Sequence, residues 1–238
     1  MSALLEVDKV EAGYGDVQVL WGADMTVAKG ETVLLMGVNG AGKTTLLRSL
    51  VGLQPCRGGA IRLNGEDISA LKPEARIRRG MAYMSELGVF PTLSIAENLR
   101  LGAYTLSGSQ ARQRADQMYQ MFPDLTKKRR AAAASLSGGQ RKMLGLAKTL
   151  MSGADLILLD EPSSGLAPVF VSQVIETLKE VIGTGTSLLI AEQNIAFLAL
   201  ADRGYLMDHG RMAVSGTRAE LEGSDAVRKA YFGVSADG

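Results

Sequence analysis

A glycine-rich segment at residues 37–45 has the composition and spacing of a phosphate-binding loop. The pattern G-x-x-x-x-G-K-T-T is formed, in order, by Gly37, Val38, Asn39, Gly40, Ala41, Gly42, Lys43, Thr44 and Thr45. It lies between an apolar run at 33–36, typical of a buried strand, and a predicted helix at 46–50. Glycine backbones and a helix start can bring N–H groups close to a phosphate chain. We expect the Lys43 amine to contact the β- and γ-phosphates and the Thr44 hydroxyl to bind Mg²⁺.

Two adjacent carboxylates, Asp160 and Glu161, follow a second apolar run at 156–159. Such a run is typical of a strand in a parallel sheet, and ligands bind beyond the carboxyl ends of those strands. Two carboxylates there are costly unless they face a metal ion or a reacting water. Asp160 is a candidate Mg²⁺ partner, directly or through water, and Glu161 a candidate base or water-positioning group. A plain turn is the alternative, and the phosphate-binding loop in the same chain argues against it.

Residues 137–140 form a second helix start that is suited to an anion. Ser137 is a good N-cap for a predicted helix through 150, and Gly138 and Gly139 leave the first N–H groups accessible, with Gln140 following. Such a start would be mostly structural on its own. Here Leu-Ser-Gly-Gly-Gln at 136–140 precedes the paired carboxylates in a chain that also contains the phosphate-binding loop. That combination is highly specific.

Strands and helices alternate along most of the chain, which indicates an α/β core. From about 94 to 152 the pattern becomes helical, and the alternation resumes at 156. We interpret the helical stretch as a sub-lobe inserted into the core, with the core at about 1–86 and 153–238 and the sub-lobe at about 87–152. The other predicted elements are strands at 4–10, 17–27, 59–65, 81–85 and 187–191, two strands around a tight turn at 205–214, and helices at 72–79, 95–101, 111–121, 169–181, 218–222 and 225–231.

Composition sets limits on the function. The 238 residues have a formal charge of +1, 46% hydrophobic and 21% charged residues, so the chain should be globular, with no strong general attraction for nucleic acid. The single Cys56, in a turn-like segment at 54–59, cannot form an internal disulfide and fits a reducing compartment. We expect neither a secretory signal nor a membrane-spanning segment, because the sequence contains no apolar run of sufficient length. Work at a membrane would then require a partner.

These motifs together resemble the ATP-binding subunits of ABC transporters over nearly the whole length. The resemblance implies one domain at 1–238 with a P-loop NTPase (RecA-like) core, an N-terminal antiparallel β subdomain and an inserted α-helical subdomain. It implies ATP and Mg²⁺ as cofactors and ATP hydrolysis coupled to solute transport. In that family the segment at 137–140 binds the γ-phosphate of ATP held by the other subunit, so two subunits enclose two ATP molecules.

The resemblance also implies individual roles. Tyr14 would stack on adenine, although an incidental aromatic at a hairpin tip is the simpler local interpretation. Glu86 would contribute to the metal site at the start of the loop between core and helical lobe, and the segment 164–167 would touch the partner subunit. The family usually has glutamine at the position of Glu86, aspartate at that of Ala167 and histidine at that of Gln193. His209, the only histidine, is expected to be a surface turn residue.

Gln193 follows the predicted strand at 187–191, so it should emerge at the same sheet edge as Asp160 and Glu161. Its amide could donate a hydrogen bond to the γ-phosphate and take a catalytic part. The alternative is that Gln193 only caps a helix starting at Asn194.

A finer resemblance is to the second ATPase subunit of branched-chain amino-acid importers, in the stretches 137–144, 165–168, 192–194 and 226–231. Its three departures from the general family are also found there. The implied partners are a second ATPase subunit (the same chain or a paralogue), two transmembrane permease subunits and, indirectly, an extracytoplasmic solute-binding protein, at the cytoplasmic face of the membrane and without nucleic acid. An importer ATPase for urea or short amides is one alternative, and a soluble ABC ATPase acting on nucleic acid or ribosomes another.

Two surface features have open interpretations. The apolar groups of Val89, Phe90, Pro91 and Leu93 either pack against the helical lobe or form a groove for a helix of the membrane subunit. The basic cluster at 127–130 is either a solvated helix end or a contact with lipid headgroups.

Overall fold

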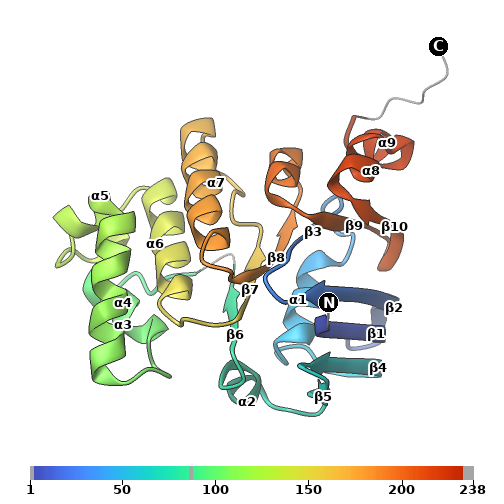
Figure 1. Ribbon diagram of the computed structural model, residues 1–238, viewed down its shortest axis with the longest axis horizontal. Coiled ribbons are helices and arrows are strands. Elements are labelled where there is room, and N and C mark those ends of the chain that lie inside the picture. The colour runs from blue at the N-terminus through green and yellow to red at the C-terminus, as the bar shows by residue number, and fades with distance from the viewer. Residues whose placement is uncertain (1–2, 86–87, 233–238) are drawn as a thin grey trace.

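A central sheet of six strands organises the computed structural model, which describes residues 3–85 and 88–232 (Figure 1). The strand order is β10-β9-β3-β8-β7-β6, parallel from β9 to β6, with β10 antiparallel to β9. The strands are β3 (Thr32–Met36), β6 (Met81–Met84), β7 (Leu156–Asp160), β8 (Ser187–Glu192), β9 (Arg203–Asp208) and β10 (Arg211–Thr217). Every residue of β3, β7 and β8 is buried, as their continuous apolar runs predict.

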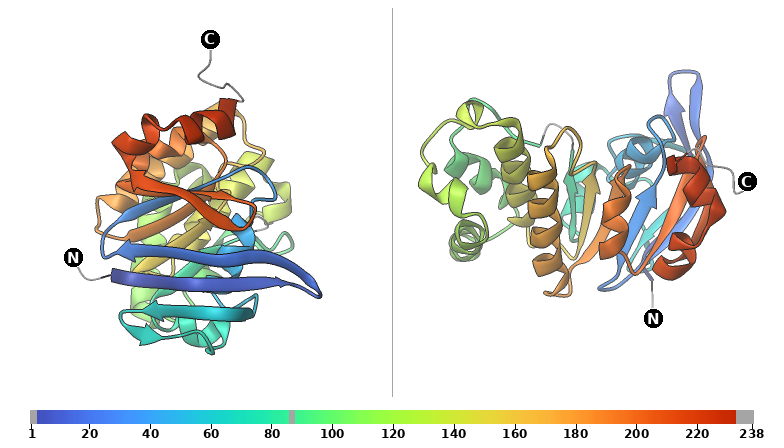
Figure 2. Two further views of the ribbon diagram at one scale, coloured as in Figure 1. Left: turned by 90° about the vertical axis from the view of Figure 1, so that its right-hand side faces the viewer. Right: turned by 90° about the horizontal axis from the view of Figure 1, so that it is seen from above.

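An antiparallel sheet from the N-terminal part of the chain lies beside the central sheet (Figure 2). Its order is β2-β1-β4-β5, with β1 (Ala3–Tyr14), β2 (Val17–Ala28), β4 (Cys56–Leu63) and β5 (Glu66–Asp67). Helix α1 (Lys43–Leu50) packs between the two sheets, and its leucines join one hydrophobic cluster with residues of both. One local prediction is wrong here, because Cys56 begins strand β4 instead of lying in a turn. Tyr14 ends β1, directly before the hairpin turn that Gly15 and Asp16 form.

The helical lobe lies at the opposite end of the molecule from the antiparallel sheet (Figure 1). It contains α3 (Ile95–Gly102), α4 (Gly108–Met121), α5 (Pro123–Lys127), a 3-10 turn at Ala133–Ser135 and α6 (Gly138–Leu150). Helices α3, α4 and α6 all begin with a capping box, in which a serine hydroxyl and a glutamate or glutamine three residues later satisfy backbone N–H groups. The predicted helices at 95–101 and 111–121 are therefore confirmed.

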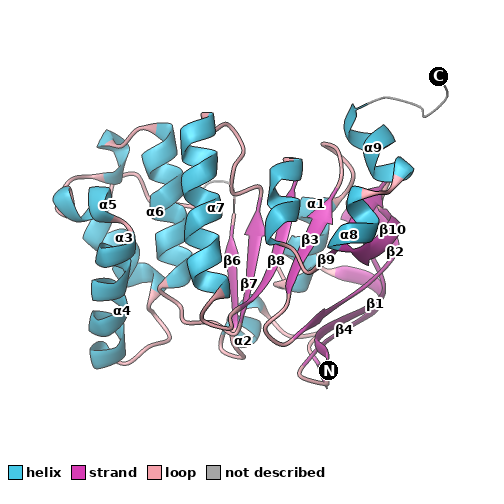
Figure 3. Ribbon diagram, turned by 45° about the horizontal axis from the view of Figure 1, so that its top comes forward, coloured by secondary structure: helices cyan, strands magenta, loops and turns pink. Residues whose placement is uncertain are grey.

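Helix α7 (Pro168–Ile182) lies between α6 and the central sheet (Figure 3). Residues of α7, the lobe and one face of the sheet form a second hydrophobic cluster, whereas α1 packs on the other face. The remaining helices are α2 (Pro73–Ile77), the 3-10 helix Ile195–Leu200, α8 (Arg218–Glu222) and α9 (Asp225–Phe232). Successive residues of β3 and β7 point to opposite faces of the sheet. Each strand therefore packs against α7 and the lobe on one face and against α1 on the other.

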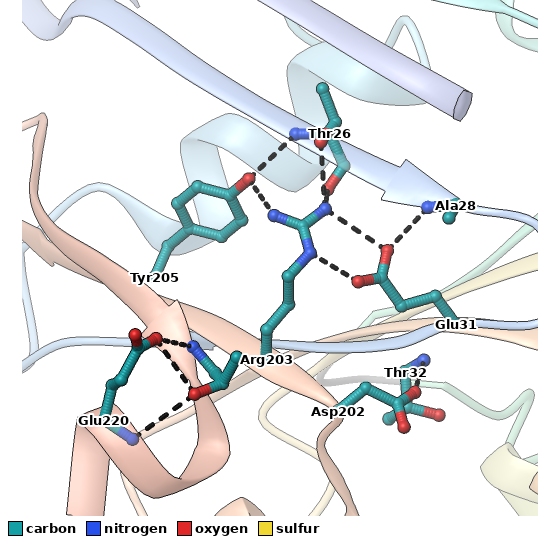
Figure 4. Close-up of polar contacts among 9 residues, drawn as sticks. Thr26, Ala28, Glu31, Thr32, Asp202, Arg203, Tyr205 and Glu220 are labelled. Atoms are coloured by element: carbon teal, nitrogen blue, oxygen red, sulfur yellow. Dashed lines mark hydrogen bonds and ion pairs between the residues drawn. The ribbon is translucent and has the colours of Figure 1, made fainter. Parts of the chain in front are cut away.

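A polar network joins the two sheets at the amino ends of the parallel strands (Figure 4). The guanidinium of Arg203 donates to both carboxylate oxygens of Glu31, to the carbonyl and hydroxyl oxygens of Thr26 and to the hydroxyl of Tyr205. The second oxygen of Glu31 also accepts the N–H of Ala28 at 2.6 Å. This network fixes the antiparallel sheet to β9 at the edge away from the phosphate-binding loop.

Candidate active site

The phosphate-binding loop joins the carboxyl end of β3 to α1, as its spacing predicts. Lys43 is the first residue of α1 and only 3% exposed. Its Nζ donates to the carbonyl oxygens of Gly37 and Val38 at 2.8 and 3.2 Å and lies 3.3 Å from Oε1 of Glu161. The amine is therefore held inside the loop, beside the N–H groups that open the helix and have no acceptor within it. Lysine and helix start together form a site for an anion.

Close packing against β9 explains why two loop positions are glycine. A Cβ at Gly37 would lie 2.5 Å from the carbonyl oxygen of Met207. Gly42 has a φ of +110°, and a Cβ there would press on the side chains of Leu20 and Met207 at 3.2 Å. The neighbouring strand β9 therefore leaves no room for a side chain at these two positions of the loop.

Asp160, the last residue of β7, is the residue predicted to bind Mg²⁺. Its side chain is 3% exposed, with Oδ1 accepting from the Thr44 hydroxyl at 2.9 Å and Oδ2 accepting from the Tyr83 hydroxyl at 2.8 Å. Burial raises the pKa of Asp160, and these two hydrogen bonds oppose that rise. Burial, together with the neighbouring carboxylate, also raises the pKa of Tyr83, so its hydroxyl stays a donor.

One carboxylate and one hydroxyl suit Mg²⁺, which keeps waters and shares substrate phosphates. In the described part of the chain, no group of three or more His, Cys, Asp or Glu residues forms an all-protein metal cage. Thr44 and Asp160 therefore fit a Mg²⁺ whose other ligands are waters and phosphate oxygens. Glu86, the third predicted metal residue, lies outside the described residues.

Glu161 has an unusual backbone that aims its side chain at the loop. Its φ is +48°, a region that a non-glycine residue adopts only when its surroundings enforce it. The N–H of Glu161 donates to the carbonyl oxygen of Ala191 at 2.9 Å, which ties this turn to the end of β8. The carboxylate is partly exposed, at 24%, so it can meet both Lys43 and a water molecule.

A cavity of about 380 Å³ opens between these groups. Three predicted residues line it: Thr44, Asp160 and Glu161. Four further residues that line it were not predicted from the sequence: Arg48, Leu53, Tyr83 and Ser85. Tyr83 could have been noticed only as the polar member of an otherwise apolar strand. Tyr14 lies at the same end of the molecule, with its hydroxyl 3.5 Å from that of Thr45 and its side chain 42% exposed. Its stacking on a base stays a prediction.

Gln193 lies at the predicted sheet edge. It follows β8, which runs parallel to β7 with Ala191 opposite Asp160. Its side chain is exposed. The capping alternative is wrong, because Asn194 itself caps the 3-10 helix by accepting the N–H of Ala196 at 3.0 Å. Its contact with a γ-phosphate stays a prediction.

The segment 137–140 lies away from the phosphate-binding loop. The Ser137 hydroxyl accepts the N–H of Gln140 at 3.2 Å, and Gln140 in turn accepts the N–H of Ser137 at 3.3 Å. A Cβ at Gly139 would lie 2.5 Å from the ring of Phe170 on α7, whereas Gly138 is exposed and open. Helix α6 packs in the cluster on one face of the sheet and α1 in the cluster on the other (Figure 1). A single chain therefore does not bring the two segments that are predicted to bind phosphate together.

Comparison with known proteins identifies the family. The ABC transporter family model matches residues 20–164. The chain belongs to the ABC transporter family. It is an ATP hydrolase coupled to transport, and the predicted fold, a P-loop NTPase core with an antiparallel sheet and a helical lobe, is confirmed. None of the described helices is long and apolar enough to cross a bilayer.

Several relatives match over 98% or more of their own length. The chain is 38% identical to the high-affinity branched-chain amino acid transport ATP-binding protein BraG of Pseudomonas aeruginosa, covering 97% of this chain and 100% of BraG. It is 35% identical to the probable branched-chain amino acid transport ATP-binding protein LivF of Archaeoglobus fulgidus, with 97% and 99% covered. The lipopolysaccharide export system ATP-binding protein LptB of Escherichia coli K12 is 32% identical, with 97% and 98% covered. The predicted resemblance to the branched-chain subunit is thus confirmed.

A solved structure gives the same result for the fold. An ATP-binding subunit of an ABC transporter, 30% identical, superposes with a TM-score of 0.82 and covers 95% of both chains.

Proposed function

We propose that this ABC ATPase energises an importer of branched-chain or other hydrophobic amino acids, as a homodimer or paired with a related ATPase subunit. The observation that carries the dimer is the separation within one chain of the phosphate-binding loop from the segment 137–140. Two copies related by a two-fold axis could bring the segment of one chain to the loop of the other. Each ATP would then be bound by residues of both subunits.

Within one site, we assign the triphosphate to the loop at 37–45 and the adenine to the exposed ring of Tyr14. Thr44 and Asp160 already share a hydrogen bond and would hold Mg²⁺, which neutralises charge on the phosphates when bound. Lys43 would transfer its hydrogen bonds from loop carbonyls to phosphate oxygens. Glu161, beside Lys43 and partly exposed, would orient the attacking water. Gln193 would donate its amide to the γ-phosphate from the neighbouring strand end.

A groove between core and helical lobe is the proposed docking site for a helix of the membrane subunit. Gly88, Val89 and Pro91 of the loop between core and lobe line a cavity of about 440 Å³ together with Met84, Arg141, Lys142, Gly145 and Leu166. Gly138, Ser164 and Gly165 also line it, and the proposed dimer assigns these three residues to the contact with the second ATPase subunit. Phe90, between Val89 and Pro91, is 51% exposed, and Nζ of Lys148 lies 5.0 Å from the centroid of its ring. Val89 lines the cavity and also packs against the hydrophobic cluster that contains the helical lobe, so the packing alternative applies to that residue as well.

The solute is supported by the relatives alone. BraG and LivF favour branched-chain amino acids, and LptB, at lower identity, keeps an export system for lipopolysaccharide as the second candidate. Urea and short amides remain import alternatives.

The test is purification of the native membrane complex through a tag on this chain, followed by ATPase assays with solute-binding protein. Permease subunits and stimulation by leucine-loaded binding protein are expected. Stimulation by urea instead would change the solute, and co-purification with lipopolysaccharide export components would change the class. In the same complex, Phe90→Ser should weaken assembly and leave the basal ATPase rate of the isolated subunit nearly unchanged. Loss of basal ATPase with intact assembly would reassign Phe90 to core packing.

A further inference from the structure

Glu192, the last residue of β8, is a buried carboxylate that contacts two loops at once. It is 3% exposed, and its Oε1 accepts the N–H of Ser163 at 2.7 Å. Its Oε2 accepts the N–H groups of Gln193 and Asn194 at 3.0 and 3.1 Å. A buried carboxylate is costly unless it is well hydrogen-bonded, and charged acceptors form the stronger hydrogen bonds. The arrangement therefore holds both loops firmly.

The first of these loops contains Glu161 in its strained conformation. The turn from Glu161 to Ser163 is fixed to β8 at two points, by the N–H of Glu161 on the carbonyl of Ala191 and by the N–H of Ser163 on Glu192. A φ of +48° persists only where the surroundings over-determine it. The hydrogen bond to Ser163 is one of the contacts that do so.

The second loop contains Gln193. Its backbone N–H is held by Oε2 of the carboxylate whose Oε1 holds Ser163. The turn after β7 and the turn after β8 are thus both hydrogen-bonded to one carboxylate.

We propose that Glu192 is a positioning residue that fixes Glu161 and Gln193 relative to each other, in register for attack on the γ-phosphate. The inference rests on the proposed roles of those two residues. This role requires a carboxylate at position 192, because both of its oxygens accept hydrogen bonds from N–H groups. A glutamine has one acceptor oxygen and one NH₂ group, so its NH₂ would oppose either Ser163 or the pair Gln193 and Asn194.

The test is Glu192→Gln in the full-length protein. We expect kcat to fall about tenfold or more while the ATP dissociation constant changes less than about twofold, since the phosphate-binding loop is not involved. Amide hydrogen exchange, followed residue by residue by NMR, should become faster at Ser163 or at Gln193 and Asn194. A merely structural role would lower the melting temperature and leave kcat of the folded enzyme unchanged.

Asp202→Asn is the matched control. Oδ2 of Asp202 also accepts a backbone N–H, that of Thr32 at 2.8 Å, but at the opposite edge of the sheet. It should lower the melting temperature and leave kcat unchanged.

If kcat is unchanged in Glu192→Gln while Glu161→Gln is inactive, the positioning role of Glu192 is wrong and the proposed active site stands. If Glu161→Gln is active, the proposed active site is itself wrong. If Glu192→Gln does not fold, Glu192→Ala takes its place. If neither folds, rapid amide exchange at Ser163 and Gln193 in the wild-type protein would refute the tether, and slow exchange would support it.

Discussion

Charged groups have different roles at the two ends of the parallel strands, which we call the amino edge and the carboxyl edge of the central sheet. At the amino edge, the Arg203 guanidinium is enclosed by Glu31, Thr26 and Tyr205, all of them protein partners (Figure 4). At the carboxyl edge, Lys43 is bound by loop carbonyls and by a partly exposed Glu161 whose backbone is strained. The contacts of Lys43 can be exchanged for contacts with a ligand, whereas the contacts of Arg203 hold the two sheets together. One edge should therefore control turnover and the other stability.

The largest effect is expected from Glu161→Gln at the carboxyl edge. The change keeps the shape and removes the base, so kcat should fall by about 10² or more while ATP binding survives. Steady-state ATPase and equilibrium ATP binding measure the two quantities. Normal turnover would remove Glu161 from the proposed mechanism and weaken the contrast between the edges.

A smaller effect is expected from Gln193→Ala. Loss of one hydrogen bond to the γ-phosphate corresponds to about 1.5 kcal/mol, or about tenfold in kcat, with little change in ATP affinity. Gln193→His should keep most of the activity. His209→Ala is the control, because His209 is 93% exposed and its Nδ1 lies 2.7 Å from Asp208 in the turn between β9 and β10. Full activity in Gln193→Ala would defeat the γ-phosphate contact.

The smallest effect on turnover is expected at the amino edge, from Arg203→Gln. Removal of the guanidinium leaves Glu31, only 13% exposed, without its cation, so the free energy of unfolding should fall by about 2 kcal/mol. The kcat of the folded protein should not change. Urea denaturation and ATPase assays on one preparation decide this, and a kcat loss without destabilisation would contradict the division between the edges.

Strong local patterns made most of the fold predictable. Fully apolar runs identified β3, β7 and β8, and the same reasoning brought Gln193 to the edge that holds Asp160 and Glu161. Long-range contacts were not predictable. The hydroxyl of Tyr83 meets Asp160, and Glu192 meets Ser163, only because neighbouring strands end together.

A motif also differs from a site. Leu-Ser-Gly-Ser-Gln at 106–110 and Leu-Ser-Gly-Gly-Gln at 136–140 both form capping boxes with an open glycine, at Gly108 and Gly138. They differ in position. Gly138 lines the cavity that also contains Ser164 and Gly165, and Gly139 packs on Phe170 of α7. Local chemistry alone therefore does not decide which helix start binds a ligand.

These two helix starts allow the central claim, that two chains complete each ATP site, to be measured directly. A Cβ at either Gly138 or Gly108 meets nothing within 4 Å, so aspartate at either position should leave the single chain folded. Each is introduced into the Glu161→Gln background, and mass is measured by light scattering with and without ATP. We expect Glu161→Gln and its Gly108→Asp derivative to change from 25.2 kDa to twice that mass on adding ATP, and the Gly138→Asp derivative to remain a monomer. An ATP-dependent dimer in the Gly138→Asp derivative would contradict the shared site, and no dimer in Glu161→Gln would exclude the homodimer and leave the pairing with a related ATPase subunit.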